Sequence, residues 1–249
     1  MKSKKVFFGV LLLTTLSLFG CGGGGGGTGS SDPTPTGTPT PTGTAVNLTS
    51  FKNAFYGKVV GSQYSFTLSG TDNKGNSWSG SYSVAAKGAT TLTNSAGQSQ
   101  NVMQCQVLVS LQQLGGGAPA TTIANYNFRV NDDAFFMYQQ GSTQYVLTTA
   151  YPPLPDTAKV GDFGTLASLK EFALFATDTI NAVWELKPDV NGGAKLVVTS
   201  DTNTAAGTNS EIDTFTLDSN GNPTKVSIRV ITRYLSTVLT DITLTGNRN

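Results

Sequence analysis

The stretch that decides the fold is Met103-Gln104-Cys105-Gln106-Val107-Leu108-Val109-Ser110-Leu111. Its odd-numbered positions are all apolar, and three of its four even-numbered positions are polar. Side chains two residues apart along a β-strand lie on the same face of the sheet. The stretch therefore predicts a strand with one buried face, and it places the thiol of Cys105 inside the protein.

The same alternation recurs on both sides of this stretch. Segments rich in Asp, Asn and Gly, such as residues 71–76 and 218–222, separate the alternating runs and are typical of hairpin turns. We expect Asn125, Asn127 and Arg129 to face outward. The side chains predicted to face inward on these strands are Tyr64, Phe66, Leu68, Trp78, Tyr82, Val84, Ala124, Tyr126, Phe128, Val130, Ile180, Ala182, Trp184, Leu186, Leu196, Val198, Phe215, Leu217, Val226, Ile228, Val230, Ile242 and Leu244.

About a dozen such strands joined by short loops predict an all-β domain of antiparallel meanders, which forms a barrel, an open half-barrel or a sandwich. Prolines in residues 151–155 exclude a central strand there, so this segment is expected to be a crossover or an edge. It divides the domain into two possible halves near residues 150–162. Residues 166–175 allow a helix, although a strand is preferred, and Phe51 and Phe55 suggest a short entry helix.

The N-terminus has the pattern of a secretory signal peptide, which we assign to residues 1–20. Three lysines precede an apolar run at residues 6–19, and this run is shorter than the roughly 20 residues that a membrane-spanning helix needs. The run ends in Leu18-Phe19-Gly20-Cys21, which resembles the lipobox of bacterial lipoproteins. That resemblance implies cleavage before Cys21 and attachment of acyl chains such as palmitate to this cysteine.

The resemblance also implies a location. In Gram-negative lipoproteins, an aspartate after the cysteine retains the protein in the inner membrane, and Gly22 stands at that position here. We therefore expect an outer-membrane anchor, with the domain on the periplasmic face or at the cell surface. Residues 21–46 combine a glycine run with a tandem Pro-Thr hexapeptide, which predicts a disordered, partly extended tether before the β domain at 47–249.

Composition excludes several classes of function. The chain has no histidine, which removes Ser-His-Asp and Cys-His catalysis and histidine metal sites. Without the three lysines of the signal peptide, 13 basic residues remain against 15 acidic ones, which does not favour nucleic-acid binding. Asp218, Asn220 and Asn222 match the start of a calcium loop, but Pro223 and Arg229 stand at its essential glycine and glutamate positions, so a turn is expected.

The remaining candidate site residues have simpler interpretations. Among the glutamates that follow the signal peptide (Glu171, Glu185 and Glu211), Glu185 is the candidate for carboxylate chemistry, yet alternation points it outward. Trp78 and Trp184 could stack on sugars, but an inward core position is favoured. We therefore predict that the protein is not an enzyme, with no catalytic, metal-binding or cofactor-binding residues and with Cys21 as the one modified site.

Three functions remain open, in order of preference. The first is a non-enzymatic lipoprotein that binds or scaffolds an unknown protein of the cell envelope. The second is a carrier of an apolar ligand or lipid in a β half-barrel, and the third is a hydrolase that uses carboxylates. The expected partners are the membrane, through the lipid on Cys21, and an envelope protein or apolar ligand, but no nucleic acid.

Overall fold

The computed structural model describes residues 45–116, 118–172, 178–191, 193–204, 207–234 and 237–249. One helix and fourteen strands make up this part of the chain. In chain order they are β1 (Ala45–Asn47), α1 (Thr49–Phe55), β2 (Gln63–Asp72), β3 (Ser77–Thr93), β4 (Ser99–Gln113), β5 (Ala120–Arg129), β6 (Phe135–Gln140), β7 (Thr143–Thr149), β8 (Thr157–Lys159), β9 (Phe163–Glu171), β10 (Thr179–Pro188), β11 (Ala194–Thr204), β12 (Gly207–Leu217), β13 (Pro223–Tyr234) and β14 (Thr237–Asn247).

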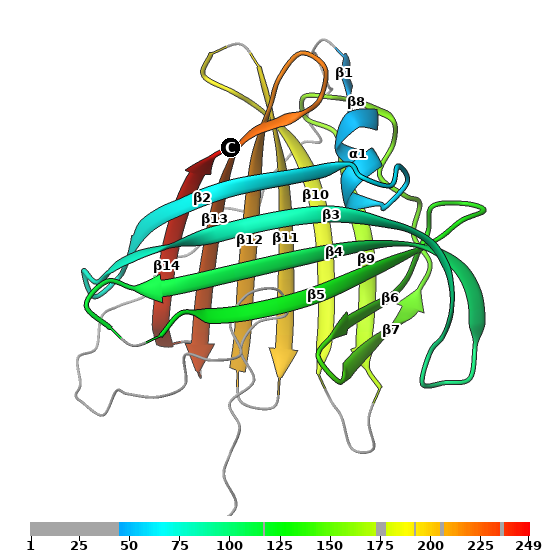
Figure 1. Ribbon diagram of the computed structural model, residues 1–249, viewed down its shortest axis with the longest axis horizontal. Coiled ribbons are helices and arrows are strands. Elements are labelled where there is room, and N and C mark those ends of the chain that lie inside the picture. The colour runs from blue at the N-terminus through cyan, green and yellow to red at the C-terminus, as the bar shows by residue number, and fades with distance from the viewer. Residues whose placement is uncertain (1–44, 117, 173–177, 192, 205–206, 235–236) are drawn as a thin grey trace, which may run out of the picture.

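Twelve of the strands form a closed antiparallel barrel, which confirms the prediction of an all-β fold. Of the three predicted architectures, barrel, open half-barrel and sandwich, the protein has the barrel. Strands β2–β7 and β9–β14 are two meanders, which the β14–β2 and β7–β9 pairs join at both edges. The two meanders thus form one barrel across the proline-rich segment. In Figure 1, β2–β5 cross the strands β10–β14 that lie behind them, and α1 lies at one end beside β1 and β8.

Most of the barrel interior is apolar because the period of two runs through nearly every strand. On β4, Cys105, Val107, Val109 and Leu111 are at most 2% exposed, as the alternation predicted. Most other predicted inward residues, from Tyr64 on β2 to Leu244 on β14, are buried as well. A closed barrel has no free sheet edges, so the apolar faces of both meanders meet in one interior.

On β5 the prediction for Val130 is wrong, and the one for Asn127 did not include its burial. Val130 is 38% exposed because β5 ends at Arg129 and the chain turns there. Asn127 is fully buried although it lies on the outward side of the strand. Its Nδ2 donates to the Met137 carbonyl at 3.2 Å, and its Oδ1 accepts from Gln104 Nε2 at 3.1 Å, so a short polar network satisfies it. The register between β5 and β6 shifts at this point.

A third correction concerns β4. Met103 is only half-buried, whereas the preceding Val102 is fully buried. Val102 packs with Phe136 and Met137 in a small cluster separate from the main core. Near the tip of the long β3–β4 hairpin, the buried residue is therefore the even-numbered Val102 and not the odd-numbered Met103. The side chains that contact Val102 there belong to β6.

The local predictions around the barrel ends hold. The helix α1 contains Phe51 and Phe55, and β9 ends at Glu171, so the preferred strand is confirmed over the described part of residues 166–175. Residues 150–156 form no strand, as the prolines required. β1 begins at Ala45, two residues before the predicted start of the domain. Cys21, the signal peptide and most of the tether lie outside the described residues.

No helix in the described ranges is long and apolar enough to cross a membrane.

Candidate functional site

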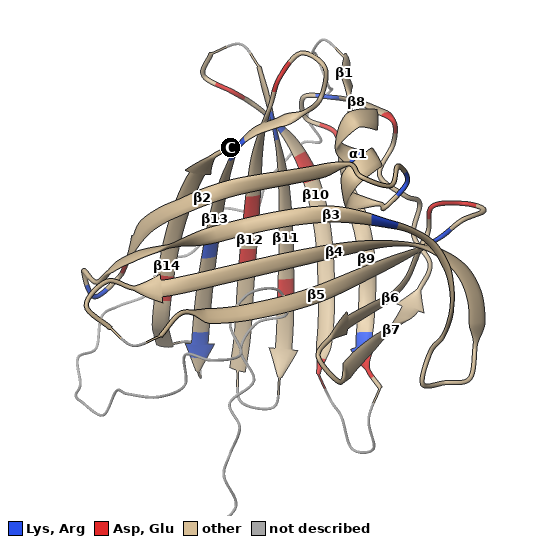
Figure 2. Cartoon of the chain, viewed as in Figure 1, with Lys and Arg blue, Asp and Glu red and all other residues tan. Residues whose placement is uncertain are grey.

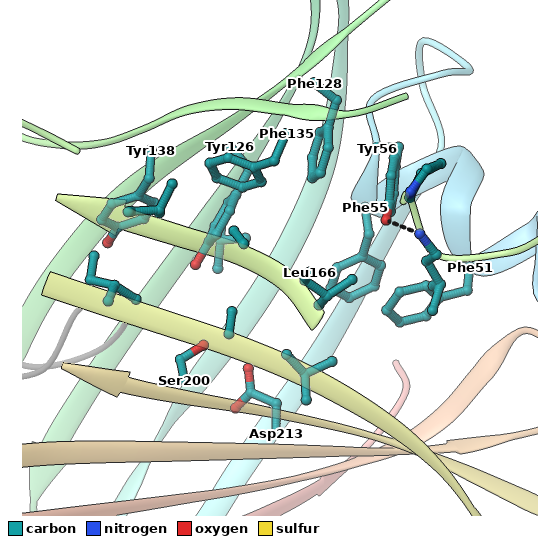
Figure 3. Close-up of a pocket in the computed structure, with 18 of the residues that line it drawn as sticks. Phe51, Phe55, Tyr56, Tyr126, Phe128, Phe135, Tyr138, Leu166, Ser200 and Asp213 are labelled. Carbon is teal, nitrogen blue, oxygen red and sulfur yellow. Dashed lines mark hydrogen bonds between the residues drawn. The ribbon is translucent and has the colours of Figure 1, made fainter. Parts of the chain in front are cut away.

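A cavity of about 120 Å³ lies inside the barrel, next to α1. Its walls come from α1 and from strands of both meanders, so residues far apart in the sequence meet there (Figure 3). Most of the lining is aromatic or aliphatic, and its polar groups are tyrosine hydroxyls, Ser200, Asp133 and Asp213. The labelled lining residues are Phe51, Phe55, Tyr56, Tyr126, Phe128, Phe135, Tyr138, Leu166, Ser200 and Asp213.

The helix α1 closes this end of the cavity with aromatic rings. Phe51 and Phe55 stack with ring centres 4.0 Å apart, and both meet the ring of Phe215 edge-on from β12. Tyr56, just after the helix, stacks on Phe128 at 4.0 Å. Such pairs add about 1 kcal/mol each beyond the area they bury. The helix is short, so these rings and not its propensity hold it in place.

The crossover after β7 is fastened to α1 by polar groups. The buried Leu154 N–H donates to the hydroxyl of Tyr56 at 3.1 Å (Figure 3). The ammonium of Lys52, a buried residue, donates to Asp156 at 2.5 Å, and Asp133 lies 3.5 Å from the same nitrogen. The hydrogen bond from Lys52 lowers the pKa of Asp156 below its usual value. The crossover and α1 thus form a cap whose single buried cation is paired.

Two carboxyl groups lie on the inward face of β12. Figure 2 shows acidic positions in the middle of this strand, and Glu211 and Asp213 are only 3% and 5% exposed. They share the parity of the buried Phe215 and Leu217, so the strand geometry itself points them inward. Asp213 lines the cavity. Glu211 follows it along the strand, further from α1.

Burial controls the protonation of this acid pair, Glu211 and Asp213. Loss of water raises the pKa of Asp213 to about 7, although its hydrogen bond with Glu211 works in the opposite direction. Burial also raises the pKa of Glu211 well above its usual value, and the adjacent Asp213 raises it further. A carboxyl in a low-dielectric interior keeps its proton because the charged form is poorly solvated. The pair therefore carries at most one negative charge near neutral pH.

The acid pair lacks hydrogen-bond donors. Glu211 Oε1, Glu211 Oε2 and Asp213 Oδ1 are buried without a donor from any other described group. When one carboxyl holds a proton, it can donate that proton to the other, which is the hydrogen bond between them. The buried Oγ1 atoms of Thr202 and Thr232 and the hydroxyl of Tyr126 are also unpartnered. Such a cluster of unsatisfied buried polar groups is costly for a folded protein and requires an explanation.

The interior changes from apolar to polar along β12. Phe215 contacts the rings of α1, and Glu211 stands four residues away, about 13 Å along the strand. Beyond the acid pair the same face continues with the buried Asn209. The neighbouring β11 has the same order, from Leu196 to Thr202. A molecule in this cavity would meet aromatic rings and the ion-paired Asp133 at the α1 end, and the carboxyl group of Asp213 further along β12.

The structure places the earlier candidates elsewhere. Glu185 points outward, with its side chain 47% exposed and 3.0 Å from the ammonium of Lys187. Trp78 and Trp184 are buried core residues, and Cys105 is fully buried, with burial raising the pKa of its thiol. The loop at Asp218 is a turn, because Asp218 Oδ1 accepts from two backbone N–H groups of that loop.

The alternation of residues along β12 is a sequence signal for the inward position of the acid pair. Burial alternates over residues 211–217, so the inward placement of Phe215 and Leu217 also places Asp213 and Glu211 inward. No motif surrounds these two residues, so the sequence did not single them out as a site. Among the described residues, no group of three or more Cys, Asp and Glu side chains lies close enough together to hold a metal ion.

The chain was also compared with known proteins. No protein-family model, no curated protein and no solved structure matches it.

Proposed function

We propose that this protein is a lipid-anchored binding protein of the cell envelope, whose β-barrel takes up a small apolar molecule without transforming it. The cavity inside the closed barrel carries this proposal, because it is lined mainly by aromatic and aliphatic side chains. Ligand sites are typically concave and apolar, with a few polar groups that fix the orientation. The cavity beside α1 has this composition.

The volume limits the size of the ligand. A dry cavity of about 150 Å³ in an engineered protein accommodates benzene, and the cavity here measures about 120 Å³. A single ring or a short alkyl chain fits this space, whereas a full-length acyl chain does not. We therefore narrow the ligand to a small apolar molecule and propose no transport of whole lipids.

The acid pair supports binding over hydrolysis. Glycoside hydrolases place two carboxyls about 5–10 Å apart on opposite sides of the scissile bond, whereas Glu211 and Asp213 are neighbours on one strand and contact each other. Proton-sharing pairs also act in aspartic proteases, but a peptide segment exceeds the available cavity.

The location rests on the N-terminal sequence. The resemblance of residues 18–21 to a lipobox supports lipidation of Cys21, and Gly22 supports delivery to the outer membrane. Two or more acyl chains are needed for stable anchoring. A Cys21→Ala variant should lose this attachment, and its recovery with the membranes in wild-type yield would refute the anchor.

Cavity-filling variants test the binding function. Ala182 lines the cavity, and Val183 beside it on β10 is 44% exposed, so Ala182→Phe and Val183→Phe place the same ring inside and outside the barrel. Toluene binding is measured by calorimetry on both variants and on the wild type. We expect Ala182→Phe to abolish binding and Val183→Phe to retain it. Lack of binding to the wild type would reject the proposal and favour a scaffold.

A further inference from the structure

The acid pair inside the barrel has no cationic partner in the described part of the chain. The groups that face Glu211 and Asp213 are the tyrosines Tyr82, Tyr126 and Tyr138, from β3, β5 and β6. Burial raises the pKa of all three phenols, so they remain neutral. Cys105 on β4 interacts electrostatically with Tyr82, and it is also neutral because burial raises the pKa of its thiol.

The unsatisfied carboxyl oxygens of the pair can only accept hydrogen bonds when ionised, whereas the unsatisfied hydroxyls of Thr202 and Tyr126 can accept or donate. Three carboxyl oxygens of Glu211 and Asp213 have no donor apart from the proton that they share. Thr202 is 3% exposed, its Oγ1 has no partner, and it follows Ser200, the residue opposite Glu211, on the inward face of β11. The hydroxyl of Tyr126 is unpartnered as well, and Figure 3 shows it on the side of the cavity that faces Ser200 and Asp213.

We propose that the ligand of the barrel is a small apolar primary amine, with its ammonium group held by Glu211 and Asp213 and its apolar part against the rings near α1. This inference rests on the proposed function and names the chemical class of its ligand. An ammonium group offers three donors and a positive charge, and a buried carboxylate is stable only when it is paired. The apolar-to-polar order along β12 fixes the orientation of such a molecule.

Amine binding is linked to proton release. Below about pH 7 the empty acid pair keeps its protons, because burial raises both pKa values and no cation stabilises the ionised form. When the ammonium enters, the carboxyl proton is displaced and leaves to solvent, so the site exchanges one positive charge for another. Affinity for the amine should therefore rise with pH up to about pH 7, by up to about tenfold per pH unit for one released proton, and level off above it.

Three probes of nearly equal size separate the possibilities. Benzylamine is protonated at pH 7, benzyl alcohol is its neutral analogue, and toluene lacks the polar group. Calorimetry on the full chain carrying Cys21→Ala, in two buffers of different ionisation enthalpy, gives both the affinity and the number of protons released. We expect benzylamine to bind at least about tenfold more tightly than benzyl alcohol, since hydrogen bonds to charged groups are the stronger ones.

Matched variants assign the effect to the acid pair. Asp213→Asn and Glu211→Gln keep the shape and remove the charge, whereas Glu185→Gln removes an outward-facing carboxyl. We expect the first two to lose the preference for benzylamine and the proton release while they retain toluene. Glu185→Gln should behave as the wild type does.

The outcomes distinguish this inference from the function on which it rests. If toluene binds and benzylamine binds no more tightly than benzyl alcohol, the amine proposal is overturned and the apolar binding function stands. If none of the three probes binds to the wild type, both are overturned. The proton count is measured on the wild type, so the test remains decisive even if an amide variant fails to fold.

Discussion

The acid pair makes the stability of the barrel depend on pH in an unusual direction. The pKa of Asp213 is about 7 in the folded protein and 3.8 when the residue is accessible, so the folded state binds more protons than the unfolded state between these values. Stability must then fall as pH rises, by about 1.4 kcal/mol per pH unit for one group. From pH 5 to pH 7 this amounts to about 2 kcal/mol, because Asp213 is already half-ionised at pH 7, and Glu211 adds in the same direction.

Urea unfolding at a series of pH values measures this loss, with the fluorescence of the buried Trp78 and Trp184 as the signal. Across this window we expect the stability of Asp213→Asn to fall by about 2 kcal/mol less than that of the wild type. Glu171 and Asp178 also have raised pKa values, but they are present in both proteins and cancel in the comparison. Parallel pH profiles for the wild type and the variant would refute the assignment of buried, protonated carboxyls.

Three further predictions concern the barrel and its cap. Cys105 should resist alkylation in the native protein and react after unfolding, because it is fully buried and burial raises the pKa of its thiol; mass spectrometry of the labelled chain checks this. Gly70→Ala should cost about 1–3 kcal/mol, because a Cβ there would lie 1.9 Å from the Thr243 carbonyl across the β14–β2 seam, whereas Ser69→Ala on the exposed face should be nearly neutral in urea unfolding. Tyr56→Phe should cost about 1–3 kcal/mol by leaving a buried N–H unsatisfied, and equal thermal stability of variant and wild type would contradict that role for the hydroxyl.

The strands and much of the core were predictable because a period of two leaves a direct trace in the sequence. The run at residues 103–111 identified a strand and placed Cys105 inside, and both outcomes are confirmed. The same logic did not predict the burial of Asn127, whose side chain is fully buried and donates to the Met137 carbonyl of the neighbouring β6. Alternation identifies the face on which a side chain lies but not what covers that face.

The site depended on contacts that no local pattern encodes. Glu211 and Asp213 share a parity with buried residues, yet their chemistry appears only when Tyr82 and Tyr126 arrive from strands more than 80 residues earlier. The pKa of a carboxyl depends on its solvation, which is a property of the closed barrel and not of the strand.

The sequence by itself determined the strands, the turns, the short helix at Phe51 and the absence of histidine chemistry, because these depend on neighbours in the chain. Only the tertiary structure decided that the meanders close into a barrel, since closure requires the β14–β2 and β7–β9 pairs between distant segments. Closure also removed water from the space around Glu211 and Asp213. That loss of water makes an acid pair with no sequence motif the most distinctive chemical feature of the described protein.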